Sequence, residues 1–478
     1  MGIKQSNLKY LGKLKLKTSR QIKDSRLSIG FETLDRDLFD PKRTYGPLSS
    51  LGVKWARVQT GWAKTEKVKG VYDFDWLDEI VDELLNIGIK PWFNVTYGNP
   101  LYSRGAEGAS VGWAPVFSKG ERLAWRKFVA ALVRHFKGRV KCYEVWNEPD
   151  ISTFWKPGRA NPDHYTELVK LTSKEIRKNF PQAFIIAGSI CRGVKSPVGL
   201  SFLERCLKNG MGKYINAVAF HSYSLFPEEC YAGGISALRY MINKYSPGLQ
   251  MWMGEGGVPS KTMVYGALSN YKGWNEARQV KHMLRRIMTD LKHDLNLISY
   301  FMVVDLFKYF GKLQFYGLLR GKDYSKKPSY FAFQSLCNIF DSKTVRSEAV
   351  QVNVRDIKYG TETAVNSETA GFIKNGSPLF VYWYPSSVMK SYKPKLFNLN
   401  LWYDCSLRFK DPVLIDPASQ KVYSIKKSRL SYLDPKINNL EVSSNKKEFS
   451  KKIILLENLP LMDYPLIIAD KSIISITK

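Results

Sequence analysis

Short apolar segments alternate with amphipathic segments from residue 28 to residue 342, and this alternation constrains the fold most strongly. The apolar segments are short and rich in β-branched and aromatic residues, which is typical of buried strands. Several of the intervening segments repeat apolar residues with the period of a helix, most clearly 75–86, 118–136 and 275–293. The predicted strands are residues 28–34, 55–59, 90–97, 140–146, 183–189, 215–223, 250–255 and 298–304.

Eight strand–helix alternations predict the α/β class and a (β/α)8 TIM barrel over residues 28–342. A doubly wound open sheet is the alternative, but no glycine-rich phosphate loop follows an early strand. Residues 343–478 contain short alternating segments separated by Pro, Gly, Asn and Ser, which predict a C-terminal all-β sandwich domain. Residues 1–27 are basic and form either a disordered tail or an edge strand that could join the β domain.

Two glutamates end predicted strands. Glu148 ends the fourth strand, where Pro149 stops it, and Glu255 ends the seventh strand between glycines. The carboxyl ends of barrel strands meet at one face, so the two side chains should converge. A facing pair of carboxyl groups is what glycoside hydrolysis requires. Taken singly, each would more often be a solvated strand-end or loop acid.

Other polar residues at strand ends could support this pair. Arg57, His221 and Tyr223 could keep a nucleophilic carboxylate ionised through charge and hydrogen bonds. Glu144 lies deeper on the fourth strand and is expected to pair with a basic residue inside the barrel. Three further strand-end acids could bind sugar hydroxyls, namely Glu32, Asp150 and Asp305.

Aromatic residues in the loops above the strands are candidate sugar-stacking platforms. The principal candidates are Tyr97, Trp113 and Trp155, with Tyr102 and Phe154 nearby. The alternative for each of them is ordinary packing within its loop.

The segment Trp146-Asn147-Glu148-Pro149 resembles the acid/base signature of the clan A glycoside hydrolases, which are retaining (β/α)8 enzymes. Residues 71–74, 221–223, 255 and 327–330 fall where that clan has matching features. The resemblance covers roughly residues 28–340. Within the clan, the chain is most similar to the β-xylosidase and α-L-iduronidase family, which also carries a β-sandwich.

The resemblance implies Glu148 as acid/base and Glu255 as nucleophile, with no metal and no cofactor. It also implies that Asn147 binds the sugar 2-hydroxyl, that Arg57 and Tyr223 support Glu255, and that His221 lines the sugar site. The chain departs from the clan on strand eight, which lacks a Trp platform, so Trp62, Trp113 or Trp155 could replace it. It departs again at Gly254-Glu255-Gly256-Gly257, where relatives carry aromatic neighbours, and this leaves the substrate open.

The net charge of +30 suggests an anionic glycan, either sulfated or uronate-bearing, as substrate. Neutral xylosides, glucosides or galactosides are the competing class. A non-catalytic carbohydrate-binding barrel is the rival function. A nucleic-acid partner is not predicted, because no binding motif accompanies the charge.

The six cysteines are scattered and predict free thiols, and no HExxH motif is present among the five histidines. No apolar run reaches the ~18 residues of a membrane span, and the N-terminus lacks a signal-peptide core. A polysaccharide substrate would place the protein in the periplasm or outside the cell. No oligomeric state is predicted.

Overall fold

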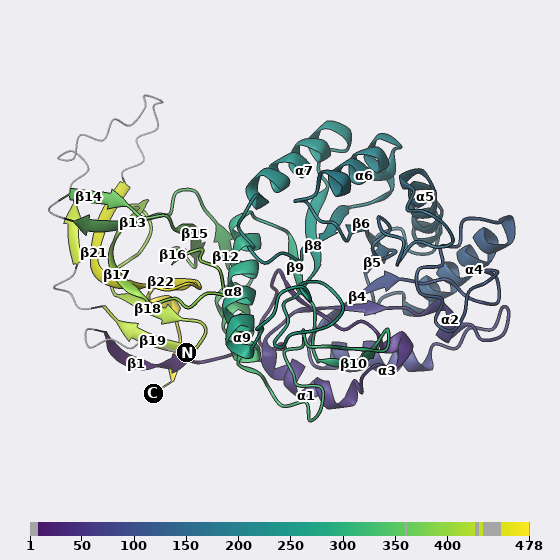
Figure 1. The fold of residues 1–478 in the computed structure, drawn as a ribbon, viewed down its shortest axis with the longest axis horizontal. Helices are drawn as coiled ribbons and strands as arrows, with labels where there is room; N and C mark the ends of the chain where they lie inside the picture. The colour runs from purple at the N-terminus through teal and green to yellow at the C-terminus, as the bar shows by residue number, and fades with distance from the viewer. Residues whose placement is uncertain (1–7, 359–360, 426–429, 434–450, 478) are drawn as a thin grey trace.

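The computed structural model describes residues 8–358, 361–425, 430–433 and 451–477, which form a barrel beside a β domain (Figure 1). Eight parallel strands close the barrel, and β2 pairs with both β3 and β9. The predicted TIM barrel is therefore confirmed. Its strands are β2 (Leu27–Gly30), β3 (Trp55–Gln59), β4 (Lys90–Val95), β5 (Cys142–Val145), β6 (Phe184–Ile190), β7 (Ala217–His221), β8 (Gln250–Gly256) and β9 (Leu297–Tyr300).

Helices pack around the outside of the barrel (Figure 1). Ser118, Asn161 and Asn275 cap three of them, because each side chain accepts hydrogen bonds from backbone N–H groups of the first helical turn. The helices are α1 (Lys42–Leu51), α2 (Trp62–Thr65), α3 (Asp75–Asn86), α4 (Lys119–Phe136), α5 (Pro162–Asn179), α6 (Pro197–Lys208), α7 (Tyr231–Tyr245), α8 (Glu276–Lys292) and α9 (Pro328–Ile339).

The last barrel strand is shorter than predicted. We expected a strand over residues 298–304, but β9 ends at Tyr300. The backbone N–H groups of Leu318 and Leu319 donate to Met302 and Val303, so this part of the chain pairs with a later loop. It also keeps single bonds to the barrel, because the Phe301 and Val303 N–H groups donate to Gly256 of β8 and Gly30 of β2. Between Val303 and Leu318 the chain forms the hairpin of β10 (Leu306–Tyr309) and β11 (Lys312–Gln314).

The amino-terminal half of the barrel interior is filled by apolar side chains. Trp92 and Trp252 pack edge to face with their ring centroids 5.4 Å apart. The Trp92 indole N–H donates to Ser28 Oγ at 3.0 Å, and the Arg57 guanidinium lies 5.5 Å from the Trp92 ring centroid. The buried guanidinium of Arg57 thus lies directly against this apolar layer.

The β domain consists, in its described residues, of two antiparallel sheets whose strands β13, β15 and β16 contact across the interface. The first sheet has the order β12-β15-β16-β22-β18-β19-β1-β23 and the second β14-β13-β17-β21-β20. The strands are β1 (Lys9–Leu14), β12 (Thr344–Arg346), β13 (Gln351–Lys358), β14 (Thr361–Ala364), β15 (Glu368–Lys374), β16 (Ser377–Trp383), β17 (Lys395–Asp404), β18 (Pro412–Asp416), β19 (Lys421–Ser424), β20 (Leu430–Leu433), β21 (Lys451–Leu461), β22 (Leu466–Asp470) and β23 (Ile476–Thr477).

The barrel and the β domain are joined by buried polar contacts. The Glu228 carboxylate accepts two hydrogen bonds of 2.7 Å from Arg285 of α8 and a third from the Trp383 indole of β16 at 2.7 Å. Lys281 of α8 pairs with Asp463 of the β domain at 2.6 Å. Among the described residues, no helix combines the length and apolar character that crossing a membrane requires.

Two adjacent glycines of α7 give a matched test of how this helix packs against the loop after β6. A Cβ atom at Gly234 would lie 2.4 Å from the Val194 carbonyl oxygen, whereas one at Gly233 meets nothing within 4 Å. We expect Gly234→Ala to lower the free energy of unfolding by about 1–3 kcal/mol through overpacking. Gly233→Ala should raise it by roughly 0.5–1 kcal/mol, because alanine restricts the unfolded chain. Urea unfolding of both variants measures the difference, and equal effects would contradict the packing.

Candidate active site

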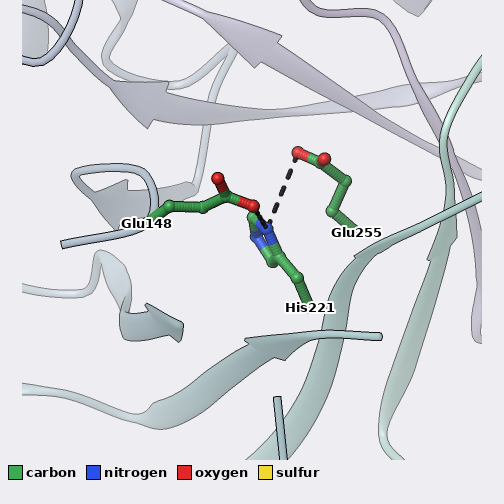
Figure 2. A group of neighbouring side chains, drawn as sticks. All are labelled: Glu148, His221 and Glu255. Atoms are coloured by element: carbon green, nitrogen blue, oxygen red, sulfur yellow. Dashed lines mark hydrogen bonds and ion pairs between the residues drawn. The ribbon is translucent and has the colours of Figure 1, made fainter. Parts of the chain in front are cut away.

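Three titratable side chains from different barrel strands meet at the carboxyl end of the barrel (Figure 2). Glu148 follows β5 by three residues, His221 is the last residue of β7, and Glu255 lies near the end of β8. One oxygen of Glu148 and one of Glu255 lie within 4.8 Å of each other and of a ring nitrogen of His221. The structure therefore brings together the two carboxyl groups that the sequence singles out.

Glu255 is held from both sides. Its Oε2 accepts a hydrogen bond from Arg57 Nη1 at 2.8 Å, and its Oε1 accepts one from the Tyr223 hydroxyl at 2.6 Å. Both donors stabilise the ionised form of the carboxylate.

Arg57 is fully buried and its guanidinium is shared among several acceptors. Its Nε donates to Glu144 Oε2 at 2.7 Å and its Nη2 donates to Asn147 Oδ1 at 2.9 Å. Burial opposes the charge of Arg57, but the carboxylates of Glu144, Glu255 and Glu32 outweigh it and raise the pKa of the guanidinium. Glu144 is thus the interior partner of a cation, as expected from its position.

Glu148 lies in an environment unlike that of Glu255. It is 5% exposed, and burial raises the pKa of its carboxyl group to about 8. The nearby charge of Asp150 adds to this rise, whereas a hydrogen bond with the Cys191 side chain and the charge of Arg57 oppose it. The backbone turns sharply here, since Glu148 has a left-handed φ of 46° and its N–H donates to Ser189 O at 3.1 Å.

His221 lies between the two glutamates (Figure 2). Its Nδ1 is 2.8 Å from Glu148 Oε1 and 3.9 Å from Glu255 Oε2. Burial lowers the pKa of the imidazole below its ordinary value, so the ring is neutral at pH 7. The side chain is fully buried, contacts Glu148 and is not among the residues that line the cavity. A sugar contact of His221 therefore stays a prediction.

Glu148, His221 and Glu255 are also close enough together to be considered as ligands of a metal ion. Both oxygens of Glu255 already accept hydrogen bonds, however, one of them from a permanent cation. A divalent ion at Oε2 would lie within a few ångströms of the Arg57 guanidinium and would be repelled by it. The residues therefore fit a hydrogen-bonded carboxyl pair better than a metal site.

A cavity of about 350 Å³ opens above the two glutamates. The residues predicted for the site that line it are Glu148, Glu255, Asn147, Tyr223, Tyr97, Glu32 and Phe154. Arg57 lies beneath it and acts through Glu255.

Three predicted substrate contacts lie elsewhere. Trp155 is fully buried and packs edge to face on Trp146 and Tyr165. Trp113 packs within its own loop, where a Cβ at Gly105 would meet its ring at 3.2 Å. Both lie outside the cavity lining, as does Trp62, which is fully buried against Tyr102 and Phe128.

Asp305 is buried in an ion pair and lies outside the cavity lining. Its Oδ1 accepts hydrogen bonds from Lys327 Nζ at 2.6 Å and from the Gly317 N–H at 2.9 Å. Both charged side chains are buried. Asp305 therefore neutralises a buried lysine, and its contact with a sugar stays a prediction.

Further aromatic lining comes from segments that the sequence did not single out. Tyr309 and Phe310 belong to the β10–β11 hairpin, and Tyr265 lies in the loop after β8. The Tyr265 and Phe310 ring centroids are 6.1 Å apart. Arg36 also lines the cavity, with its guanidinium 5.7 Å from the Tyr97 centroid. Phe310 and Gly311 form the hairpin turn with left-handed φ values of 49° and 71°, but Phe-Gly is not among the dipeptides that signal such a turn in a sequence.

Comparison with solved structures places this architecture among known glycoside hydrolases. A family 39 glycoside hydrolase from Bacteroides cellulosilyticus WH2 matches 93% of this chain and 81% of its own, with a TM-score of 0.65 and 18% identity. A monomeric β-xylosidase from Caulobacter crescentus CB15 matches 96% and 97%, with a TM-score of 0.58 and 17% identity. At such identities, these likenesses establish the fold alone.

Sequence comparison defines the family. Residues 53–359 match the model of "Glycosyl hydrolases family 39", and this chain belongs to that family. A β-xylosidase of Geobacillus stearothermophilus is 26% identical over 165 residues, which are 33% of this chain and 32% of that protein. A β-xylosidase of Caldicellulosiruptor saccharolyticus is 24% identical over 288 residues, 55% and 56% of the two chains. The matched stretches thus span about a third and just over half of these relatives.

The Asp305–Lys327 pair gives a prediction that separates a structural role from substrate binding. Asp305→Ala leaves the Lys327 charge buried and unpaired, so we expect the free energy of unfolding to fall by about 3–5 kcal/mol. The double variant Asp305→Ala/Lys327→Met should recover much of this loss. Denaturant unfolding measures both variants. If Asp305→Ala unfolds like the wild type but binds sugar more weakly, Asp305 is a substrate contact.

Proposed function

We propose that this chain is a retaining glycosidase that releases a neutral sugar, of the β-xyloside type, from the non-reducing end of its substrate. Glu255 is the nucleophile and Glu148 the acid/base. Family membership supports the hydrolase class, and the similarity to two β-xylosidases supports a β-xyloside as the substrate.

The separation of the two carboxyl groups carries the proposal. Retaining enzymes hold them about 5–5.5 Å apart, whereas inverting enzymes need about 6.5–9.5 Å to admit a water molecule. Oxygens of Glu148 and Glu255 lie within 4.8 Å of each other, which favours direct attack by one carboxylate.

The two environments assign the roles. A general acid must hold a proton at working pH, and burial gives Glu148 a pKa of about 8. A nucleophile must be ionised, and Glu255 accepts hydrogen bonds from Arg57 and the Tyr223 hydroxyl. Opposed environments for two facing carboxyl groups are the usual way in which one site obtains both an acid and a base.

The reaction then proceeds in two displacements. Glu255 attacks the anomeric carbon while the bond to the leaving oxygen breaks and Glu148 gives that oxygen its proton. The products are a glycosyl ester on Glu255 and the free alcohol. Glu148, now ionised, takes a proton from water as the water oxygen attacks the anomeric carbon and releases Glu255. Asn147 is oriented by Arg57 and keeps its amide N–H groups free to meet the sugar 2-hydroxyl.

The charge of the cavity favours a neutral sugar over the anionic glycan suggested by the net charge. Glu32, Glu148 and Glu255 all line the cavity, whereas Arg36 is the cation among the residues that line it. Arg36 is itself paired with Asp35 at 3.2 Å. A carboxylate or sulfate on the sugar would therefore meet three carboxyl groups and an arginine whose charge is already paired.

The small cavity supports action on a terminal sugar. Its volume lies near the lower end of the range for small-molecule sites. The β10–β11 hairpin and the segment of Tyr265 and Gly266 wall it on one side. The rival of a non-catalytic sugar-binding barrel is opposed by the intact carboxyl pair and its supporting donors.

Substitution of each glutamate should give a different product with azide. In Glu255→Ala, turnover of an aryl β-xyloside should fall to background. Azide fills the vacated space and attacks once, so the glycosyl azide has inverted anomeric configuration. In Glu148→Ala the ester still forms from a good leaving group, and azide then attacks it from the opposite side, which gives the retained configuration. NMR of the two products assigns the roles, and exchanged products would reverse them.

Two controls accompany this experiment. Wild-type protein that is inert on aryl β-xylosides, β-glucosides and β-galactosides, yet binds sugar, would favour the non-catalytic barrel. Faster hydrolysis of an aryl β-glucuronide than of the β-xyloside would favour the anionic substrate class.

The pKa of Glu148 predicts the alkaline limb of the activity profile. Because this pKa is raised to about 8, the acid is protonated below that pH and loses its proton above it. We therefore expect kcat/KM for a phenyl glycoside to fall as pH rises through about 8. A dinitrophenyl glycoside, whose leaving group needs little protonation, should show a weaker limb. If kcat/KM of Glu148→Gln for the phenyl glycoside falls over the same pH range, the pKa belongs to another group.

A further inference from the structure

The wall of the cavity at the end of β2 contains two polar atoms without partners. Glu32 and Thr33 are 2% and 1% exposed, and both line the cavity. Glu32 Oε2 and Thr33 Oγ1 are buried and have no hydrogen-bond partner among the described residues. Buried polar groups in proteins are nearly always paired, because an unpaired one costs free energy. Two such atoms on adjacent residues of one cavity wall indicate a partner that enters from outside the chain.

The backbone conformation and its hydrogen bonds hold Glu32 and Thr33 at the wall of the cavity. Thr33 has a left-handed φ of 74°, which is costly for a β-branched residue. Its N–H donates to Gln59 Oε1 at 3.2 Å, and this contact helps to hold the turn. A Cβ atom at Gly30 would lie 2.3 Å from Glu32 Oε2, so the glycine leaves room for that oxygen.

Glu32 is also connected to the proposed nucleophile. Its Oε1 lies 3.3 Å from Arg57 Nη1, the same nitrogen that donates to Glu255 at 2.8 Å. Burial raises the pKa of Glu32 to about 8, and the charge of Glu255 adds to the rise despite Arg57. At neutral pH the group therefore holds a proton and can donate as well as accept a hydrogen bond.

We infer that Glu32 and Thr33 form the edge of the sugar site that binds two hydroxyl groups of the terminal sugar. This assignment rests on the proposed function and names the residues that determine its specificity. Within the part of the chain that the structure describes, Glu32 Oε2 and Thr33 Oγ1 have no partner, and a neutral sugar with neighbouring hydroxyls would pair with both. Their strain and desolvation are then offset only in the complex.

The assignment predicts opposite effects on stability and on activity. Thr33→Val keeps the shape and β-branching of the side chain and removes an unpaired hydroxyl. Its melting temperature without sugar should be equal to or above that of the wild type, while kcat/KM for 4-nitrophenyl β-xyloside should fall about 10-fold. Thr33→Ser keeps the hydroxyl and should retain activity within about 3-fold. A residue that only supports the fold would lose stability and activity together.

Deoxy substrates identify the hydroxyl that each residue binds. We would measure kcat/KM of the wild type, Thr33→Val, Glu32→Ala and Glu32→Gln on the xyloside and on its 2-, 3- and 4-deoxy analogues. For each variant, one deoxy analogue should have the same kcat/KM as it has with the wild type. That analogue lacks the hydroxyl that the deleted side chain binds, so the deletion removes no further hydrogen bond. Glu32→Gln, which keeps hydrogen-bonding capacity, should lose much less than Glu32→Ala. Uniform losses across all analogues would overturn the assignment.

A binding experiment separates this inference from the proposed reaction. Calorimetric titration of xylobiose into Glu148→Gln protein measures affinity without turnover. Adding Thr33→Val or Glu32→Ala should weaken that affinity about 10-fold. Unchanged affinity in both would overturn the inference even if the wild type hydrolyses xylosides. Weakened affinity would support it even if hydrolysis itself were absent.

Discussion

The guanidinium of Arg57 holds the upper half of the barrel together. It projects from β3 and contacts Glu32 beyond β2, Glu144 on β5 and Glu255 on β8, so that it joins four strands around the barrel. A buried charge costs several kcal/mol unless it is fully paired. The contacts therefore have to form together, and the position of each carboxylate depends on the others.

This shared cation also explains why the glutamates differ. Glu255 and Glu144 each accept a short hydrogen bond from Arg57, whereas the bond to Glu32 is longer and Glu148 bonds instead to His221. Burial raises the pKa values of Glu32 and Glu148, and the charge of Arg57 compensates this only in part. One cation placed off-centre thus gives similar side chains of one cluster different environments.

Local periodicity was enough to predict the barrel, whereas the choice of Glu148 and Glu255 among the strand-end acids needed the family resemblance at residues 146–149 as well. Other features depended on contacts distant in sequence. Helix α1 was missed because Gly46 and Pro47 interrupt its pattern, although Leu48 and Leu51 are buried. Asp305 looks like any strand-end acid until Lys327 is placed beside it by the closing loop. The burial of Trp155 depends on Tyr165 from α5, which no pattern near residue 155 reveals.

The pairing of β1 with β19 has a consequence for the making of the protein. Lys9 and Ser424 are partners in one sheet, although about 400 residues separate them. At synthesis rates of roughly 5–20 residues per second, β1 waits for about 20–80 s before its neighbour exists. The barrel lies between them in the chain and can form during that interval. The β domain can close this sheet only after β19 and β23 have been made, so β1 is paired long after its own synthesis.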